Sequence, residues 1–429
     1  MTEPEPNSRR PGGQAVSRRR SWLLLAALVI VGLLIATAVF FWWLRSDRDL
    51  DGLRRELQAE HLPTSWEELD LHLSPPATLA TWKRIGELSK LLKPYYTQYP
   101  TFVGTTAALT PFSPVPDAAR LHHAMLDQER FDELRTCVDA LGDQRLELRT
   151  SSVFSTRMDE IGIGRNVGYL LQEDALLAPP GRVAAACRRL LRFAAIQPRG
   201  TMLSHLIQIG QIEVALTTVA GRLDALGRDP LRVDDLVESV AAMAVDDLPD
   251  METREMLCAW KSFATGPGRE YRVPVTGVRW LDPVLSPVVL RAGRAGLLRY
   301  QADLIHRYAQ PLGPAGPDSV IADLERESDT RHLSPTAYMV GMVSASDPII
   351  CRQSHVCRLH GLLVLAELRG QAWPRDPFDP AHPQLRALVR AGRTVGAYCV
   401  GRDGVDHFGK RPDHYFPLLE RLEPLKPAP

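Results

Sequence analysis

Hydrophobic positions recur at helical spacing through most of the chain. After the Pro75-Pro76 pair, apolar residues at 79, 82, 85, 88, 91 and 92 fall on one face of a helix. Residues 117–141 show the same amphipathic pattern, and residues 201–226 are apolar on most sides, which predicts a central buried helix. Short links between such segments indicate antiparallel helices, and no fixed period supports a regular repeat array. We therefore expect an irregular helical bundle or a solenoid-like body over residues 45–370.

The pattern changes towards the C-terminus. A last helix over residues 354–370 is expected to end at Gly370, a common stop residue. Beyond it, the segments LRALV, VGAYCV and HYFPL are short and separated by Gly, Asp and Pro, which predicts a small antiparallel β module over residues 371–418. Residues 419–429 form a Pro-rich tail. The Pro- and Gly-rich residues 271–289 are interpreted as a lid or linker.

Near the N-terminus, the segment Trp22 to Leu44 contains 23 residues without a charge. A helix of that length measures about 34 Å, enough to cross a hydrocarbon core of roughly 30 Å with some tilt. Trp22 stands at one end and Trp42 and Trp43 at the other, where indole rings favour the headgroup region. A buried core helix is excluded by the length and by the apolar character on all sides. The sequence thus predicts a transmembrane helix over 22–44, with the lipid bilayer as a partner.

The orientation of this helix follows from the charges on either side. Arginines precede it at 9, 10, 18, 19 and 20 and follow it at 45, 48, 54 and 55. The cluster before the span directly abuts it, whereas the later arginines alternate with aspartates, so we expect the N-terminus to lie inside. A twin-arginine export signal is disfavoured because no small-residue cleavage site follows. We therefore predict a single-pass signal-anchor protein of the bacterial cytoplasmic (inner) membrane, with a disordered basic tail over 1–21 and an extracytoplasmic body.

Composition narrows the classes of partner. The 51 basic and 51 acidic residues cancel, and beyond the first twenty residues no long run of one sign occurs. A nucleic-acid binder would carry a basic patch, so nucleic acid is excluded as an expected partner. An apolar fraction of 45% with 24% charged residues is typical of a folded chain.

Two Cys and two His occur within residues 351–360, which invites a metal site. A helix turns by about 100° per residue, so these four side chains would point in different directions and could not meet at one ion. The six cysteines are spread along the chain at 137, 187, 258, 351, 357 and 399. We expect buried structural thiols rather than a disulfide framework.

The C-terminal module carries a resemblance. Asp376-Pro-Phe, then Leu385-Arg386, then YCVGRDGVD over residues 398–406 resemble the "DPF…LRY…YSVGPDGxDDGG" ending of a group of uncharacterised single-span, mostly helical bacterial membrane proteins. A related ending occurs in type II secretion pseudopilins, where acidic residues of the loop bind calcium. The resemblance implies Asp403 and Asp406 as calcium candidates, with Asp413 further off. The paired acids and glycines of that ending are reduced here to Asp406, His407, Phe408 and Gly409, which leaves fewer ligands for a hard cation.

No catalytic motif stands out. The sequence contains no G-x-S-x-G elbow, no H-E-x-x-H and no P-loop, and GIGRNVG over residues 162–168 has the wrong spacing for a dinucleotide loop and is interpreted as a loop and helix start. His122 and His123 fall on an amphipathic helix without an evident partner.

We therefore expect no catalytic residue and no bound cofactor other than calcium. We expect the protein to bind or scaffold an envelope protein or polymer in the cell envelope. The alternative is an envelope hydrolase with an unrecognised active site, and a pseudopilin-like component of a secretion machine is a third hypothesis.

Overall fold

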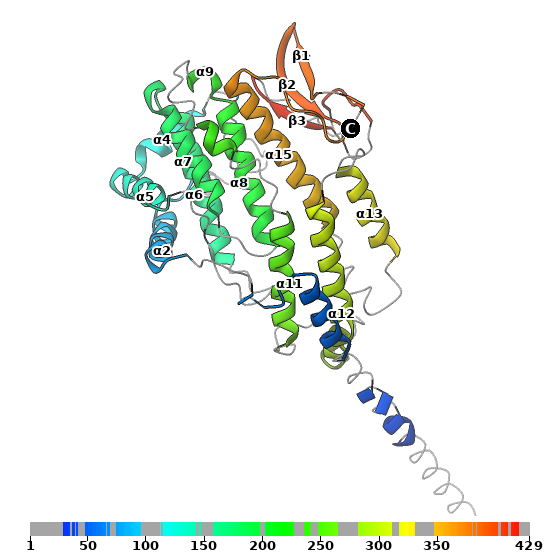
Figure 1. Ribbon diagram of the computed structural model, residues 1–429. Helices are drawn as coiled ribbons and strands as arrows, with labels where there is room; N and C mark the ends of the chain where they lie inside the picture. The colour runs from blue at the N-terminus through cyan, green and yellow to red at the C-terminus, as the bar shows by residue number, and fades with distance from the viewer. Residues whose placement is uncertain are drawn as a thin grey trace, which may run out of the picture.

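The computed structural model covers the chain and describes most of the helical body and the C-terminal sheet (Figure 1). The described residues are 29–34, 37–38, 40–41, 48–65, 67–68, 74–95, 112, 115–142, 146, 158–197, 202–226, 236–241, 248–264, 282–310, 317–330, 347–379, 381–382, 384–401, 405–410 and 413–419. Within the helices, the side chains of residues 158–161, 202–203, 258–264, 282–294, 318, 325, 327–330 and 347 are not described. The fold is mainly helical with a small antiparallel sheet near the C-terminus, as predicted.

The elements follow one another in a simple order along the chain. They are α2 (Pro76–Leu91), α4 (Asp117–Met125), α5 (Gln128–Ala140), α6 (Met158–Leu177), η2 (Pro180–Arg182), α7 (Val183–Ala195), α8 (Met202–Ala220), α9 (Leu223–Leu226), α11 (Leu248–Ala264), α12 (Asp282–Ala309), α13 (Pro317–Thr330), α15 (Asp347–Arg369), β1 (Arg386–Arg390), β2 (Arg393–Cys399) and β3 (His414–Pro417).

The helix α8 lies at the centre of the body. It packs against α6, α7, α11 and α15, and it also reaches β3 (Figure 1). Its residues Ala215, Leu216 and Val219 are fully buried, so the prediction of a central helix from its nearly all-round apolar pattern is confirmed. On the outer side, α2 covers α6, and α5 lies against α2 and α7, with Trp82 of α2 stacked on Phe193 of α7. One continuous hydrophobic cluster joins these helices.

Four predicted helix boundaries were wrong, one of them the start of the last helix, which lies at Asp347 and not at residue 354. The single helix predicted over 117–141 is two helices: α4 ends at Met125, and Asp127 caps the start of α5 by accepting a hydrogen bond from the Arg130 amide at 3.1 Å. The predicted helix 201–226 ends at Ala220 and resumes as the short α9 after a turn at 221–222. The last eight residues of the supposed linker 271–289 belong to α12, where Pro283 falls in the first turn and so removes no helical hydrogen bond.

The segment 162–168 lies inside α6, not in a loop. Its glycines allow two glutamine side chains to approach the helix: a Cβ on Gly164 would fall 2.2 Å from Gln197 Oε1, and one on Gly168 would fall 1.7 Å from Gln211 Oε1. These glycines therefore serve close packing of α6 against α7 and α8, which a helical glycine provides at some cost in propensity.

The helix α15 contains the Cys- and His-rich segment 351–360 and ends at Gly370, whose φ of +62° is the left-handed conformation of a helix stop. Cys351 and Cys357 are buried thiols that form no disulfide, as are Cys187 and Cys399. The segment is thus helical, as predicted, and all four of its Cys and His side chains are buried.

The three strands form one antiparallel sheet in the order β1-β2-β3. A two-residue turn at Ala391 (φ +47°) and Gly392 (φ +76°) joins β1 to β2, and Arg390 stands directly opposite Arg393. Gly396 lets β2 approach β3, because a Cβ there would fall 2.6 Å from the Phe416 carbonyl. Buried side chains of the sheet, among them Ala397, Cys399 and Phe416, belong to the same hydrophobic cluster as the helices, so the module packs on the body.

The predicted span 22–44 falls largely outside the described residues. Its described parts, 29–34, 37–38 and 40–41, are helical and expose large apolar side chains such as Leu33, Leu34 and Phe41. Within the ranges that the structure describes, no helix combines the length and apolar character needed to cross a membrane. The helix that follows, residues 48–59, packs on α12 (Figure 1).

Candidate functional site

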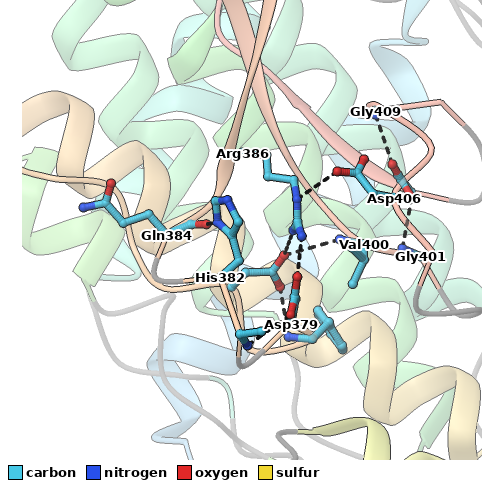
Figure 2. Close-up of polar contacts among 12 residues, drawn as sticks. Asp379, His382, Gln384, Arg386, Val400, Gly401, Asp406 and Gly409 are labelled. Carbon is cyan, nitrogen blue, oxygen red and sulfur yellow. Dashed lines mark hydrogen bonds and ion pairs between the residues drawn. The ribbon is translucent and has the colours of Figure 1, made fainter.

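The densest polar cluster of the C-terminal module is centred on Arg386 of β1, which faces three carboxylates (Figure 2). Arg386 Nη1 donates to Asp376 Oδ2 at 3.0 Å, Nη2 donates to Asp379, and Nε lies 3.1 Å from Asp406 Oδ2. The Arg386 side chain is 12% exposed and that of Asp376 is 0% exposed. A planar guanidinium with several fixed donors is the cation best suited to hold separate carboxylates in this way.

Local turns position two of these carboxylates, Asp376 and Asp379. Asp376 Oδ1 accepts from the Phe378 amide at 2.9 Å, and Asp379 Oδ1 accepts from the Ala381 amide at 3.1 Å. Both are turns in which an aspartate bonds the backbone two residues on, typical of Asp beside Pro. Asp376 Oδ2 also lies 3.4 Å from the Val400 amide at the end of β2, so it ties the turn to the sheet.

A fourth carboxylate, Asp413, fixes the loop that follows β2. It accepts from the backbone amides of Gly401 at 3.2 Å, His407 at 2.9 Å and Gly409 at 3.0 Å. Figure 2 shows the bonds to Gly401 and Gly409 converging on one carboxyl group. Asp406 adds a bond to the Phe408 amide at 2.8 Å. Buried amides need such acceptors, and Asp413 supplies them for the described part of this loop.

Burial and neighbouring charges shift the pKa values of the ionisable groups in the Arg386 cluster. Burial raises the pKa of Asp376 against the opposing effect of its backbone donors and Arg386. The hydrogen bond from Arg386 lowers the pKa of Asp379. Burial alone would lower the pKa of Arg386, but the hydrogen bond and charge of Asp379 outweigh it and raise that pKa. Burial, with the charge of Asp406, raises the pKa of Tyr398 to about 12. Arg386 therefore stays cationic and balances the surrounding acids.

Of the two predicted calcium ligands, Asp403 and Asp406, the structure describes only Asp406. Asp403 lies outside the described residues. Asp406 faces Arg386 with one oxygen and the Phe408 amide with the other, and Asp413 is engaged with backbone amides. In the described part of the chain, no group of three or more His, Cys, Asp or Glu side chains is arranged to hold a metal ion.

A buried pair missed by the sequence analysis joins His122 of α4 to Glu173 of α6. His122 Nδ1 lies 2.9 and 3.1 Å from the two Glu173 oxygens, and Nε2 lies 2.9 Å from the Lys93 carbonyl. His123 Nδ1 is 3.5 Å from the same carboxylate. The prediction that these histidines lack a partner was thus wrong. The only sequence signal was the run Gln172-Glu173-Asp174 in a helix that is otherwise apolar at its buried positions.

A second missed pair lies where α8, α15 and the sheet meet. His360 Nδ1 is 2.8 Å from Glu213 Oε2, and the His360 ring centroid lies 5.2 Å from that of Phe416 in β3. Burial raises the pKa of Cys357 well above its ordinary value, as do the charge and hydrogen bond of Glu213, so this thiol is neutral. The His360 side chain is buried. Through its contacts with Glu213 and Phe416, it links α15 and α8 to the sheet.

Comparisons with known proteins give no guide to function: no family model, no curated protein and no solved structure matches this chain.

Proposed function

We propose that the protein is a single-pass protein of the bacterial inner membrane whose extracytoplasmic helical body acts as a binding or scaffolding element in the cell envelope. The observation that carries this proposal is the succession of an uncharged apolar segment, 22–44, and a helix that docks directly on the body. Such a succession is what a folded body held at a membrane surface without a long linker would need.

The docking of residues 48–59 is extensive for a short helix. Leu53 and Leu57 are almost fully buried against Leu298, Ala302 and Ile305 of α12. Burial of one such leucine contributes about 1.5–3 kcal/mol. At the rim, Arg299 lies 3.0 Å from Glu56, and His306 lies 3.1 Å from Glu60. The two helices therefore run in the same direction.

The described ionisable groups favour binding over catalysis. In the C-terminal module, the described carboxylates face Arg386 or backbone amides, which leaves their charge engaged in structure. The pairs His122–Glu173 and His360–Glu213 have the composition of an acid–base dyad, but both histidines are at most 3% exposed, so a substrate could not reach them without unfolding. A hydrolase therefore has less support than a binding protein.

A topology measurement tests the anchor. Reporters that are active on only one side of the membrane would be fused after Leu44 and after Pro429. We expect extracytoplasmic activity at both points; cytoplasmic activity at either point would contradict the proposal. Crosslinking in cells should then recover an envelope protein or polymer with the full-length chain, and a chain that recovers neither would contradict the binding role.

We also propose that Asp403 and Asp406 bind calcium, because the C-terminal module resembles the calcium-binding ending of type II secretion pseudopilins. Its test is thermal unfolding of the full chain with added calcium or with a chelator. A bound calcium ion would raise the midpoint by mass action, and the rise would disappear in Asp403→Asn. An unchanged midpoint in millimolar calcium would rule out a calcium role in stability.

A further inference from the structure

The strand β1 lies at an edge of the sheet and has β2 on its inner side. The direction of its backbone groups follows from the bonds of β2. The Val395 carbonyl accepts from the amides of Leu418 and Leu419 at 3.0 and 2.9 Å, so Val395 faces β3. Because backbone groups alternate in direction along a strand, Gly396 faces β1, and its register partner Leu388 faces β2. The N–H and C=O groups of the two residues beside Leu388 therefore point away from the sheet.

These two residues are Ala387 and Val389. Both are exposed, and Val389 is exposed to 56%. Within the described part of the chain, β1 pairs with β2 alone, and nothing bonds the outward N–H and C=O groups of this pair of residues. Figure 1 shows the β1–β2 hairpin extending beyond the ends of the helices, in keeping with this exposure. An open strand edge of this kind is a template for another strand.

The backbone of β1 is complementary to itself in one register. When two β1 strands pair in antiparallel fashion, outward groups of one strand must meet outward groups of the other. This happens for all of them when Ala387 of each copy lies opposite Val389 of the second copy. Leu388 then meets Leu388 of the second copy on a two-fold axis. Both copies present the same surface, as the interface of a two-fold symmetric dimer requires.

Other registers leave outward groups unpaired. A shift of two residues in one direction places Val389 opposite Leu385, whose N–H already donates to the Pro374 carbonyl at 2.9 Å. The opposite shift places Ala387 opposite Ala391, whose φ of +47° belongs to the turn and not to a strand. We propose that two copies of this chain pair through the outer edges of β1 and join their sheets into one continuous sheet. This dimer goes beyond the proposed envelope role and does not depend on it.

Charge supports a second copy as the occupant of this edge. The proposed register places the basic side chain of Arg390 from the second copy opposite Arg386, on the same face of the sheet. Asp376, Asp379 and Asp406 surround Arg386, so three carboxylates face one guanidinium and leave a surplus of negative charge there. Opposite charges across a strand pair are stabilising, and the two-fold axis gives each copy one such contact. The hydrogen bonds of the pairing come from the backbone, and this charge only adds to them.

Sedimentation of the full-length protein in detergent micelles tests the pairing. We expect a dimer whose population rises with protein concentration. Val389→Pro removes one outward N–H from each copy, and an edge strand tolerates proline where that N–H would face solvent. The loss of two hydrogen bonds should weaken the dimer about tenfold or more. Val389→Thr keeps the N–H and the β-branched shape, so this matched control should dimerise as wild type.

A disulfide cross-link tests the register. Residues opposite each other in a non-hydrogen-bonded antiparallel pair have Cα atoms about 4.5 Å apart, within the range that a disulfide bridges. Under mild oxidation, Leu388→Cys should therefore form a covalent dimer on a non-reducing gel, and wild type should not. Thr394→Cys on β2 is the matched control, because it is exposed but lies away from the outer edge of β1. This test does not depend on whether Val389→Pro folds.

Three outcomes would overturn the inference. One is a mass of a single chain at every concentration of the wild-type protein. Another is a dimer that Val389→Pro leaves unchanged while hydrogen exchange shows an intact β2, since dimerisation would then come from another surface. The third is a Thr394→Cys cross-link as efficient as that of Leu388→Cys.

Discussion

His122 and Glu173 form a buried ion pair between α4 and α6, with exposed fractions of 3% and 1%. Both ring nitrogens of His122 face acceptors, Glu173 on one side and the Lys93 carbonyl on the other. A neutral imidazole has only one N–H, so both contacts are hydrogen bonds only when the ring is an imidazolium. This pair ties α4 to α6 and to the chain beyond α2.

Stability should depend on pH through this pair. Burial lowers the pKa of His122, but Glu173 and the Lys93 carbonyl outweigh it and raise that pKa above 6.5. Burial likewise raises the pKa of Glu173, but the hydrogen bonds and charges of His122 and His123 lower it below 4.5. The stabilisation that His122 contributes is thus complete below pH 6.5, and it is lost as the pH rises through the raised pKa of His122. The stabilisation that Glu173 contributes is complete above pH 4.5, and it is lost as the pH falls through the lowered pKa of Glu173.

Urea unfolding of the full chain across pH 4–9 checks this window. In His122→Ala, Glu173 is left as a buried charge, and we expect a loss of about 3–5 kcal/mol at pH 6 that shrinks at high pH. The exposed pair His306–Glu60 supplies the control, since His306→Ala should cost less than about 1 kcal/mol at any pH. A pH-independent loss in His122→Ala would contradict the charged pair.

Removing Arg386 should unfold the C-terminal module before the body. Arg386→Ala leaves Asp376, Asp379 and Asp406 facing one another without a cation, and we expect a loss of about 3–5 kcal/mol. Hydrogen exchange would show faster exchange in β1 and β2 than in α8. Calcium should partly restore protection in this variant, because its three convergent carboxylates suit a hard cation. Equal exchange in module and body would contradict this local role.

Gly396→Ala should separate β2 from β3. Its Cβ would fall 2.3 Å from Tyr415 Cε2 and 2.6 Å from the Phe416 carbonyl, and the backbone atom cannot move aside. We expect a destabilisation of about 1–3 kcal/mol in thermal or urea unfolding. Gly162→Ala in α6 is the control, since nothing lies within 4 Å of its Cβ and alanine favours a helix by roughly 1 kcal/mol. A stable Gly396→Ala variant would contradict the close strand approach.

Ala391→Asn should stabilise the hairpin. Ala391 has a φ of +47°, a left-handed conformation that asparagine tolerates better than alanine, and Asn-Gly is the preferred pair for this turn. We expect a gain of about 0.5–1 kcal/mol, seen as a higher thermal midpoint. Ala387→Asn, an exposed change within β1, should give no such gain. A lower midpoint in Ala391→Asn would show that the turn is of another type.

Local signals were enough for much of the fold. The apolar spacing of residues 79–92 predicted α2, of which Trp82, Ile85 and Leu88 are buried. Gly370 predicted the end of α15, and three short segments predicted the three strands. The break at Asp127 was missed because the amphipathic pattern continues through it, while the cap that divides the helices is a single hydrogen bond.

The sequence predicted only some of the residues of the candidate site. Asp406 was singled out as a calcium ligand through a resemblance. The residue that it faces, Arg386, lies twenty positions earlier; it was noted as part of the same motif, but no role was predicted for it. The pairs His122–Glu173 and His360–Glu213 join residues 51 and 147 positions apart. Periodicity gives the face of a helix on which a residue lies, not the helix that it will meet.

The sequence by itself therefore determined the elements: a helical body, a strand-rich ending and an uncharged apolar segment before them, because backbone propensity and hydrophobic spacing act over a few residues. Only the tertiary structure decided which charges meet. Packing brought Arg386 among three carboxylates and His122 onto Glu173, and it left Arg390 and Arg393 together at the end of a hairpin. The physical reason is that burial makes an unpaired charge costly, so distant residues are paired by the fold as a whole.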